Sequence, residues 1–394
     1  MNETAKAHGL DGTLVEPDWP PLKLDEVRTV LQSFPTAGDP IEILSSSPRP
    51  FSAASVVDTR LGRVFIKRHY RLVRDAEGLM EEHRFMDHLR ANGIGVPLVF
   101  STVAGDTAVE MGDWTYEVHT IPEGIDLYED AISWTPFRSV DHARSAGEML
   151  ARLHIAATGY GAAARRPRPL VSSFTIFASQ DAREATKQYL AVRPVLEQHL
   201  QTRRDCEEAL YLLTPFHEEL KPLLPSLQPF WTHNDLHASN LFWSDKSPNA
   251  RATAVIDFGL ADQTNAVHDI AHAIERNIVE WLVLVNDPAH PEAVPFHFDH
   301  LHALLSGYES VRPLSLAERA ALAPMAALCH AEFTLSEADY FLGVLHSPEK
   351  AAMAYDGWLV GHARWFRGPG RKLIDAIRQW AGARATHPDG AAAR

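Results

Sequence analysis

Two closely spaced motifs constrain the fold of this chain more than any other feature. The first is WTHNDLHASNLF at residues 231–242, and the second is AVIDFG at residues 254–259. Asp235 and Asn240 are separated by four residues, which places a carboxylate and an amide on one loop. Asp257 follows a short apolar run that is typical of the end of a buried strand. We therefore expect the three side chains to meet in one cleft.

The residue types indicate which chemistry such a cleft supports. Mg²⁺ prefers oxygen ligands, and transfer of a phosphoryl group needs a carboxylate that orients the accepting hydroxyl. Asp235, Asn240 and Asp257 supply these groups. The same segment has another interpretation, in which His233, Asp235 and His237 bind zinc. No second cluster of His or Cys stands out in the sequence to complete such a site.

The two motifs resemble those of the aminoglycoside phosphotransferase and choline kinase group, small-molecule kinases that share the fold of eukaryotic protein kinases. The matching residues are His233, Asp235 and Asn240 in HNDLHASN, followed by the Asp257–Gly259 motif in the required order. The resemblance implies that Asp235 is the catalytic base, that Asn240 and Asp257 hold Mg²⁺, and that ATP is the phosphoryl donor. His233 would brace the loop.

The resemblance also implies an α+β fold class, a bilobal protein-kinase-like fold with an antiparallel-sheet N-lobe and a mainly helical C-lobe. We divide the chain into an N-terminal extension at residues 1–40, an N-lobe at 41–118, a hinge at 119–124 and a C-lobe at 125–394. The extension, with a short helix starting near Asp25, is expected to pack on the small lobe. The tail from residue 386 is rich in Pro, Gly and Ala and is expected to be disordered.

The small lobe is expected to provide the residues that bind nucleotide. Three β-rich segments and a helix follow one another there: Ile41–Leu44, Ala54–Val57, Gly62–Lys67 and Asp75–Arg90. In the kinase fold, a strand lysine neutralises the α- and β-phosphates, and a helix glutamate holds that lysine extended. Lys67 with Glu82 is the expected pair, and Glu81 is the competitor for the glutamate position.

Two further segments of the small lobe are assigned by position only. Residues 45–52 lie where a protein kinase has a glycine-rich phosphate loop, but they contain no glycine, and their serines receive no firm role. Residues 114–124 are predicted as a strand followed by a connector. By analogy, His119 to Ile121 form the hinge whose backbone binds adenine.

Downstream of residue 124 the pattern becomes helical. A helix is expected at Asp141–His154, with His154 in the core rather than in catalysis. Residues 161–173 form a basic loop, interpreted as a solvated linker, with contact to phosphate as the alternative. Helices across residues 175–220 would line the acceptor pocket, as the resemblance implies.

The residues after Gly259 exclude a protein kinase. No Ala-Pro-Glu motif follows, and Asn234 stands where protein kinases use Arg before the catalytic Asp. A helix is expected from about His268, and the resemblance assigns Asp269 to bracing the catalytic loop. Several acidic side chains are interpreted as solvated, with the acceptor cleft as the alternative: Glu275, Glu280, Glu332, Glu337 and Asp339. An aromatic cluster is interpreted as helix packing, with a cation-binding cage as the alternative: Tyr340, Phe341, Tyr355, Trp358, Trp365 and Phe366.

Charge and composition limit the partners. With 51 Asp and Glu against 37 Lys and Arg, the net charge of −14 disfavours nucleic-acid binding. Ordinary acidic solubility explains this charge, and steering of a cationic acceptor is the alternative. Two cysteines, Cys206 and Cys329, are too few for a disulfide framework and are expected as free thiols. Neither a secretory signal nor a membrane span is evident, so a cytoplasmic location is expected.

These observations predict an ATP-dependent phosphotransferase that moves the γ-phosphoryl group to a hydroxyl of a small molecule. The resemblance leaves several acceptor classes open, namely aminoglycosides, sugars, amino alcohols and homoserine-like compounds. A catalytically inactive nucleotide-binding protein of the same fold is one alternative, and a zinc hydrolase is the other. No nucleic-acid or membrane partner is expected, and the sequence leaves the oligomeric state open.

Overall fold

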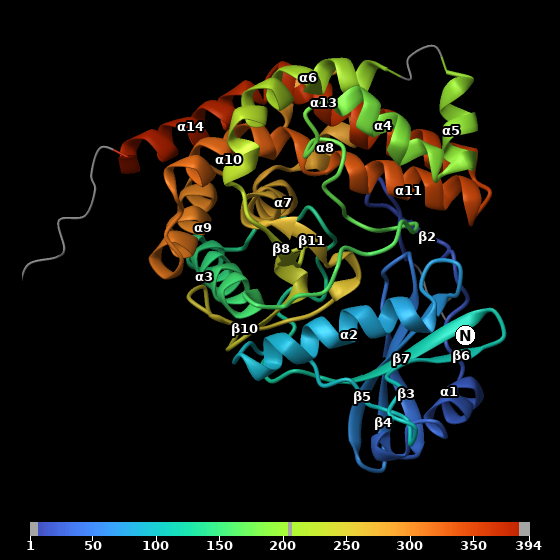
Figure 1. Ribbon diagram of the computed structural model, residues 1–394. Coiled ribbons are helices and arrows are strands. Elements are labelled where there is room, and N and C mark those ends of the chain that lie inside the picture. The colour runs from blue at the N-terminus through green and yellow to red at the C-terminus, as the bar shows by residue number, and fades with distance from the viewer. Residues whose placement is uncertain (1–6, 204–206, 386–394) are drawn as a thin grey trace, which may run out of the picture.

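The protein is described by a computed structural model that covers residues 7–203 and 207–385 (Figure 1). Its smaller lobe, coloured blue to cyan, is built on an antiparallel sheet of five strands. Its larger lobe is mainly helical and contains four short strands among the described residues. The sequence predicts this α+β arrangement of a sheet lobe and a helical lobe, and the prediction is confirmed.

The sheet of the small lobe has the strand order β3-β4-β5-β7-β6. Alternation along β5 sends Ile66 into the core that faces helix α1 (Leu24–Leu31) and sends Lys67 to the opposite face. Lys67 lies directly across from Glu117 of β7, so both side chains belong to that opposite face. The strands are β3 (Pro40–Ser46), β4 (Ala53–Thr59), β5 (Gly62–Tyr70), β6 (Val109–Met111) and β7 (Trp114–Thr120).

One helix of the small lobe, α2 (Ala76–Ala91), lies between the sheet and the large lobe (Figure 1). Asp75 caps its first turn by accepting a hydrogen bond from the Gly78 N–H at 2.8 Å. Phe85 is fully buried, and its ring centroid lies 5.9 Å from that of Phe258 in the large lobe. The helix therefore packs on both lobes.

The larger lobe is organised around α7 (Ala266–Ile278), a helix in which every residue is buried. Asn265 caps its first turn by accepting a hydrogen bond from the His268 N–H at 3.0 Å. A helix without an exposed face lies inside a lobe rather than on its surface. The other helical segments are α3 (Val140–Ala157), α4 (Ala182–Ala191), α5 (Pro194–Gln201), α6 (Glu208–Leu220), α8 (Trp281–Asn286), α9 (Phe298–Val311), α10 (Leu316–Leu328), α11 (Ala331–Gly343), α12 (Pro348–Ala352), a π-helix (Met353–Val360), α13 (Gly361–Arg367) and α14 (Arg371–Ala385).

Four short strands position the two motifs identified in the sequence: β8 (Pro229–Thr232), β9 (Leu241–Trp243), β10 (Ala252–Val255) and β11 (Asp262–Asn265). β8 pairs with β11, and β9 pairs with β10, in both cases antiparallel. Residues 233–240, here called the HNDLHASN loop, connect β8 to β9, and Asp257 lies between β10 and β11. The two strand pairs therefore bring both motifs to one place.

The N-terminal segment, for which the sequence predicts packing on the small lobe, contacts both lobes. It contains β1 (Ala7–His8) paired with β2 (Leu14–Val15). The His8 N–H donates to the Pro48 carbonyl of the small lobe at 2.9 Å. However, the Trp19 indole N–H donates to the Tyr340 hydroxyl of the large lobe at 3.1 Å. The segment contacts both lobes because its polar groups find partners on each.

Some predictions concern residues beyond the described ranges. Cys206 and the tail from residue 386 lie outside the described residues. Cys329 is a buried free thiol, as predicted. In the part of the chain that the structure describes, no helix has the length and apolar character needed to cross a membrane.

Close contact between α3 and α9 depends on two glycines. A Cβ atom at Gly147 would lie 2.0 Å from the Leu304 carbonyl oxygen, and a Cβ atom at Gly307 would lie 2.1 Å from the Arg144 carbonyl oxygen. Both distances are far shorter than van der Waals contact. The two backbones therefore touch, and a side chain at either position would force the helices apart.

We predict that Gly147→Ala lowers the free energy of unfolding by about 3 kcal/mol, because the added methyl group overpacks a backbone contact. Urea unfolding followed by circular dichroism measures this change. Gly382→Ala is the matched control, since Gly382 lies in α14 with open space around an added Cβ. The control should be neutral or stabilising by up to about 1 kcal/mol. Equal losses in both variants would contradict the role of Gly147.

Candidate active site

A cavity of about 1060 Å³, counted with its open mouth, lies between the lobes. Its lining includes Arg49 and Lys67 from the small lobe and Asp235, Asn240 and Asp257 from the large lobe. Four of these residues were predicted from the sequence, and they therefore share one cavity: Lys67, Asp235, Asn240 and Asp257. The remaining predicted site residues are not part of its lining: Glu82, His119 and Ile121.

Asp257 and Lys67 form an ion pair in this cavity, with 3.0 Å between Oδ1 and Nζ. Asp257 has a φ of 59°, a left-handed backbone conformation that is uncommon outside glycine and concentrates at functional sites. Burial opposes ionisation of Asp257, but the charge and hydrogen bond of Lys67 outweigh it and hold the pKa of this carboxyl well below its usual range. Asp257 is therefore ionised at neutral pH.

Asn240 lines the same cavity as Asp257. Its Nδ2 donates to the Asp235 carbonyl at 2.9 Å, so the oxygen of the same amide has no part in that bond. The Ile256 N–H donates to the Asn240 carbonyl at 2.9 Å and fixes the loop next to the residue that precedes Asp257. An ionised carboxylate and an amide oxygen are hard oxygen donors, and this donor set fits Mg²⁺.

Asp269 of α7 holds the HNDLHASN loop in place. One carboxylate oxygen of Asp269 accepts a hydrogen bond from the His233 N–H at 2.8 Å, and the other accepts from the Asn234 N–H at 2.8 Å. His154 Nε2 lies 3.0 Å from Asp269 Oδ2 in a fully buried pair. Asp269 thus has the bracing position that the resemblance implies, and His154 is a core residue, as predicted.

Asn234 has a structural reason to replace the arginine of protein kinases. Its φ of 61° is left-handed, a conformation that Asn tolerates better than most residues. Its side-chain oxygen accepts from the Thr264 hydroxyl at 3.0 Å, and its amide donates to the Leu260 carbonyl at 3.2 Å. These bonds fix the turn that leads into Asp235.

Asp235 receives a hydrogen bond from a residue that sequence reasoning missed. The Arg276 Nε–H donates to Asp235 Oδ1 at 2.9 Å, and Arg276 is buried. Burial raises the pKa of Asp235 and the charge of Asp257 adds to this rise, whereas Arg276 and His233 oppose it. Arg276 follows Asp269 by seven residues on α7, and this two-turn spacing is the signal that could have identified it.

The zinc interpretation of the loop lacks its ligand set. His233 Nε2 lies 3.0 Å from the Ile256 carbonyl oxygen, and His237 Nε2 lies 3.8 Å from Asp235 Oδ2. Within residues 7–203 and 207–385, a different group of side chains lies close enough together to bind a metal ion: His83, Glu117 and His119.

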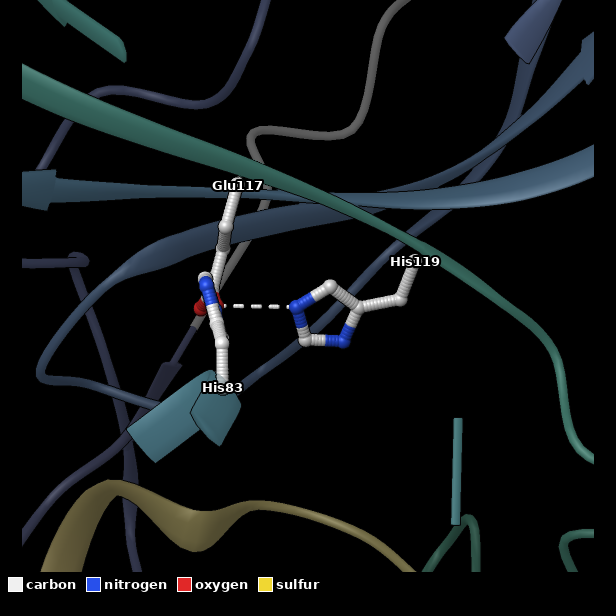
Figure 2. A group of neighbouring side chains, drawn as sticks. All are labelled: His83, Glu117 and His119. Atoms are coloured by element: carbon white, nitrogen blue, oxygen red, sulfur yellow. Dashed lines mark hydrogen bonds and ion pairs between the residues drawn. The ribbon is translucent and has the colours of Figure 1, made fainter. Parts of the chain in front are cut away.

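Figure 2 shows this cluster, with Glu117 and His119 on β7 and His83 on α2. His83 Nε2 and His119 Nε2 lie 2.6 and 2.8 Å from the same oxygen, Glu117 Oε2. His69 Nε2 lies 2.9 Å from the other carboxylate oxygen. Each of the three imidazoles is already a hydrogen-bond partner of Glu117, so these bonds account for the arrangement without a bound ion.

The histidines keep Glu117 ionised inside the lobe. Burial alone would raise its pKa, but His119, His69 and His83 outweigh burial and hold the pKa of Glu117 well below its usual range. Burial likewise opposes the charge of Lys67, and its pKa is nevertheless raised, first by Asp257 and then by Glu117. Glu117 is therefore a buried anion on the same face of the sheet as Lys67.

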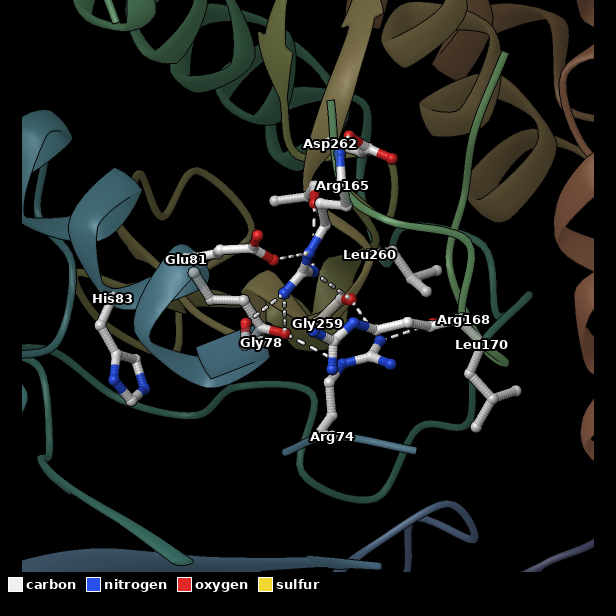
Figure 3. Close-up of polar contacts among 12 residues, drawn as sticks. Arg74, Gly78, Glu81, His83, Arg165, Arg168, Leu170, Gly259, Leu260 and Asp262 are labelled. Atoms are coloured by element: carbon white, nitrogen blue, oxygen red, sulfur yellow. Dashed lines mark hydrogen bonds and ion pairs between the residues drawn. The ribbon is translucent and has the colours of Figure 1, made fainter. Parts of the chain in front are cut away.

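The predicted pair between Lys67 and Glu82 is not formed. Glu82 Oε1 instead accepts hydrogen bonds from Arg165 Nη2 at 2.7 Å and from Arg74 Nε at 3.0 Å. Figure 3 shows Arg165 at the centre of this network. Glu82 and both arginines are buried. Two guanidinium groups thus satisfy Glu82, while Lys67 pairs with Asp257.

The basic segment at residues 161–173 is not the solvated linker that the sequence predicts. Arg165 is buried, and its Nη1 donates to the Gly259 carbonyl at 3.2 Å. Arg74 Nη2 donates to the same carbonyl at 2.7 Å (Figure 3). The two arginines therefore connect α2 to the segment that follows Asp257. The prediction was wrong because the acidic partners of these arginines are distant in the sequence.

The predicted hinge begins too early. β7 continues through Thr120, so His119 lies inside the strand and opposite Phe65 of β5. The imidazole of His119 is engaged with Glu117. The connector starts at Ile121, because pairing with β5 extends the strand to this point. Contact between adenine and Ile121 stays a prediction.

Three acidic side chains that the sequence predicts as solvated are buried. Glu275 accepts a hydrogen bond from the Trp134 indole N–H at 3.0 Å, and Glu332 accepts one from the Thr175 N–H at 2.6 Å. Glu337 is 3% exposed. The prediction fails because α7 and α11 are covered on nearly all sides. The two other acidic side chains, Glu280 and Asp339, are half-buried.

The aromatic side chains of the cluster are buried in helix packing, as predicted: Tyr340, Phe341, Tyr355, Trp358, Trp365 and Phe366.

The sheet lobe, the helical lobe and the cavity between them define a protein of the protein-kinase-like class. Comparison of sequences then identifies the family. The sequence model of the phosphotransferase enzyme family matches residues 51–314, which is more than half of the chain. The chain belongs to this family.

Two relatives are homoserine kinases. The one from Rhodospirillum rubrum is 30% identical over 291 residues, which are 72% of this chain and 76% of that protein. The one from Gluconobacter oxydans is 26% identical over 248 residues, which are 60% of this chain and 63% of that protein. The second match therefore spans less than two thirds of the relative.

Two solved structures share the fold. A microcompartment-associated aminopropanol kinase has a TM-score of 0.57 at 19% identity, with coverage of 91% of this chain and 100% of that chain. An amicoumacin kinase in complex with AMP-PNP and Ca²⁺ has a TM-score of 0.52 at 16% identity, with coverage of 87% and 93%. At these identities the similarity concerns the fold.

We predict that Arg165→Ala lowers the free energy of unfolding by about 3 to 5 kcal/mol, because the change removes one partner of a buried ion pair and leaves Glu82 less compensated. Thermal unfolding measures the loss. Arg166→Ala is the matched control from the same segment, since the Arg166 side chain is 72% exposed and lies 3.6 Å from Glu77. The control should change stability by less than about 0.5 kcal/mol. Equal melting temperatures for the two variants would show that the buried network does not stabilise the fold.

Proposed function

We propose that this protein is an ATP-dependent kinase that transfers the γ-phosphoryl group to a hydroxyl of a small molecule. The observation that carries the proposal is the shared cavity of Lys67, Asp235, Asn240 and Asp257. Membership of the phosphotransferase enzyme family supports it. A catalytically inactive protein of the same fold would be expected to lack at least one of these groups, and all four are present.

Asn240 and Asp257 are the residues that would hold Mg²⁺, because they offer an amide oxygen and an ionised carboxylate. Mg²⁺ held there would neutralise negative charge on the phosphate groups. Lys67 adds a positive charge to the same cavity for the α- and β-phosphates. Glu117 attracts Lys67 from the neighbouring strand and in this respect takes the place expected for Glu82.

Asp235 is the proposed base. In the transfer, the bond between the γ-phosphorus and its bridging oxygen to ADP breaks, and a bond from phosphorus to the acceptor oxygen forms. The hydroxyl proton passes to Asp235, whose Oδ1 accepts a hydrogen bond from Arg276 and whose Oδ2 accepts a longer one from Asn240 Nδ2 at 3.4 Å. The raised pKa of Asp235 increases its affinity for this proton. In a loose transition state, the carboxylate orients the hydroxyl more than it deprotonates it.

The division of roles predicts different defects for two variants. Asp235→Ala should lower kcat by about 10³-fold and leave MgATP binding nearly unchanged, because the lost group faces the acceptor. Asp257→Ala should weaken metal-dependent nucleotide binding, because it removes a metal ligand. Release of ADP measures turnover, and calorimetric titration with MgATP measures binding. Asp106→Ala, at an exposed loop position, is the control and should match the wild type. Equal loss of nucleotide binding in the first two variants would refute the division.

The acceptor pocket supports a finer proposal, namely that the acceptor carries an amine. Glu337 of α11 lines the cavity, and its Oε1 is buried without a hydrogen-bond partner among the described residues. Burial raises the pKa of Glu337 to about 8, an effect that Arg276 opposes and Glu275 strengthens. An ammonium group that binds next to such a buried carboxyl group stabilises its ionised form and donates the missing hydrogen bond. Homoserine and aminopropanol, which appear in the names of similar proteins, both carry amines.

The proposal predicts a pH-dependent KM for such acceptors. Glu337 must be ionised to bind an ammonium group, so KM should fall as pH rises towards about 8, by about tenfold per pH unit. Glu337→Gln should remove this dependence and raise KM at pH 8 by about 10-fold to 100-fold. Release of ADP with homoserine and with aminopropanol at several pH values measures both effects.

Glu349→Gln is the control for this experiment, since Glu349 is an exposed residue at the start of α12. It should leave the pH profile unchanged. A sugar without an amine should show no comparable dependence of KM on pH. A lower kcat in Glu337→Gln with an unchanged KM would refute amine recognition by Glu337.

A further inference from the structure

The turn between β3 and β4 carries an arginine where other kinases have glycines. Residues 45–52 contain no glycine, and Arg49 lies near the tip of this turn. Arg49 lines the cavity together with Lys67, Asp235 and Asp257. A side chain of the small lobe therefore reaches the groups proposed for metal binding and catalysis.

Hydrogen bonds fix Arg49 against the large lobe. Its Nη2 donates to the Ser239 hydroxyl at 2.6 Å and to the Ala131 carbonyl at 3.2 Å. Its Nη1 donates to the Ser133 hydroxyl at 3.4 Å. Ser239 belongs to the HNDLHASN loop and lies four residues after Asp235. The guanidinium is thus positioned beside the reactive loop rather than free in solvent.

The hydrogen-bond partners of Arg49 carry no charge. All three are neutral oxygen atoms, and Arg49 makes no ion pair within residues 7–203 and 207–385. Burial lowers the pKa of Arg49, and three carboxylates oppose this effect from beyond ion-pair distance: Asp257, Asp235 and Asp126. Arg49 is half-buried and its nearest carboxylates lie beyond ion-pair distance, so an anion that reaches the guanidinium gains a charge-assisted hydrogen bond.

The other Lys and Arg side chains in the described lining differ from Arg49 in this respect. Lys67 is paired with Asp257, and Arg276 is paired with Asp235. Arg74 is paired with Glu82. Among the described Lys and Arg side chains of the lining, Arg49 is therefore the one without an ion-pair partner.

We propose that Arg49 binds the γ-phosphoryl group of ATP and stays bound to it during transfer. The guanidinium has five N–H donors and the protein uses three of them, so the remaining N–H groups can donate to phosphate oxygens, over which a loose transition state spreads negative charge. Arg49 forms no covalent bond in this step. The phosphorus leaves the bridging oxygen of ADP for the acceptor oxygen, and the hydroxyl proton goes to Asp235. This inference rests on the proposed function.

A carboxylate on the acceptor presents similar chemistry to a guanidinium, so the test must separate the two anions. Homoserine carries a carboxylate and aminopropanol does not. Likewise, AMP-PNP carries a γ-phosphoryl group and ADP does not. Comparison within each pair assigns the anion that Arg49 binds.

The experiment uses Arg49→Ala and Arg49→Lys in the full chain, with Arg60→Ala as the matched control. Arg60 lies in the neighbouring turn of the same sheet with its side chain 77% exposed. In Arg49→Ala, calorimetry should show about tenfold weaker binding of Mg-AMP-PNP and nearly unchanged binding of Mg-ADP. Its kcat should fall by about 100-fold with homoserine and with aminopropanol alike. Arg49→Lys should retain part of the activity, and Arg60→Ala should match the wild type.

Two results would overturn the proposal. One is an unchanged preference for AMP-PNP over ADP in Arg49→Ala, and the other is a defect confined to homoserine, which would assign Arg49 to the acceptor carboxylate. If Arg49→Ala fails to fold, as judged by circular dichroism, Arg49→Lys is subjected to the same comparisons, and its results decide in the same way. A wild-type protein that binds no Mg-ADP would instead refute the proposed function, so the two failures are distinguishable.

Discussion

Two backbone amides of one loop donate to a single buried carboxylate, and the geometry of the cavity depends on this contact. Asp269 accepts from His233 and Asn234 and thereby fixes the chain just before Asp235. Burial opposes ionisation of Asp269. Several neighbouring groups, of which His154 has the largest effect, outweigh burial and lower the pKa of Asp269. A charged acceptor strengthens both amide hydrogen bonds. The loop is therefore held by an ionic brace that belongs to the most buried helix of the molecule.

The same helix also fixes the side chain of Asp235 and the middle of the loop. Arg276 holds one oxygen of Asp235, and Asn277 bonds to the loop backbone at both the Leu236 carbonyl and the Ala238 N–H, each at 2.9 Å. Since every residue of α7 is buried, this helix has little freedom to move relative to its lobe. Groups that are fixed before a ligand arrives need little reorganisation during a reaction. The architecture of the large lobe thus supports a pre-formed site.

Sequence reasoning located the site, but it did not find which charges pair there. The two motifs suffice for the loop and for Asp257, because their spacing is local and short connections between strands bring them together. Glu82 was assigned to Lys67, whereas its partner Arg165 lies 83 residues further along the chain. No periodicity indicates a contact of that separation. Glu117 was overlooked for a related reason: its position across from Lys67 follows from the pairing register of β5 and β7, which the sequence does not state.

The acidic residues of α7 and α11 show a second limit of sequence reasoning. A charged residue in a helical pattern is normally expected on a solvated face. That expectation holds for a helix on the surface, but these two helices are covered nearly all round by neighbours. Glu332 and Oε1 of Glu275 accept hydrogen bonds inside the lobe, and Arg276 lies 3.4 Å from the other oxygen of Glu275 as its ion-pair partner. Glu337 has an unpartnered oxygen, and it is the residue for which burial points to a ligand.

The arginine contacts of α2 have a consequence for movement of this helix. Arg74 and Arg165 tie this helix to the Gly259 carbonyl, directly beside the end of the second motif. Swinging the helix outward, the displacement that silences many signalling kinases, would expose both guanidinium groups and strip Glu82 of its counter-ions at once. Because displacement of α2 breaks several buried charge pairs together, this helix is strongly fixed relative to the second motif.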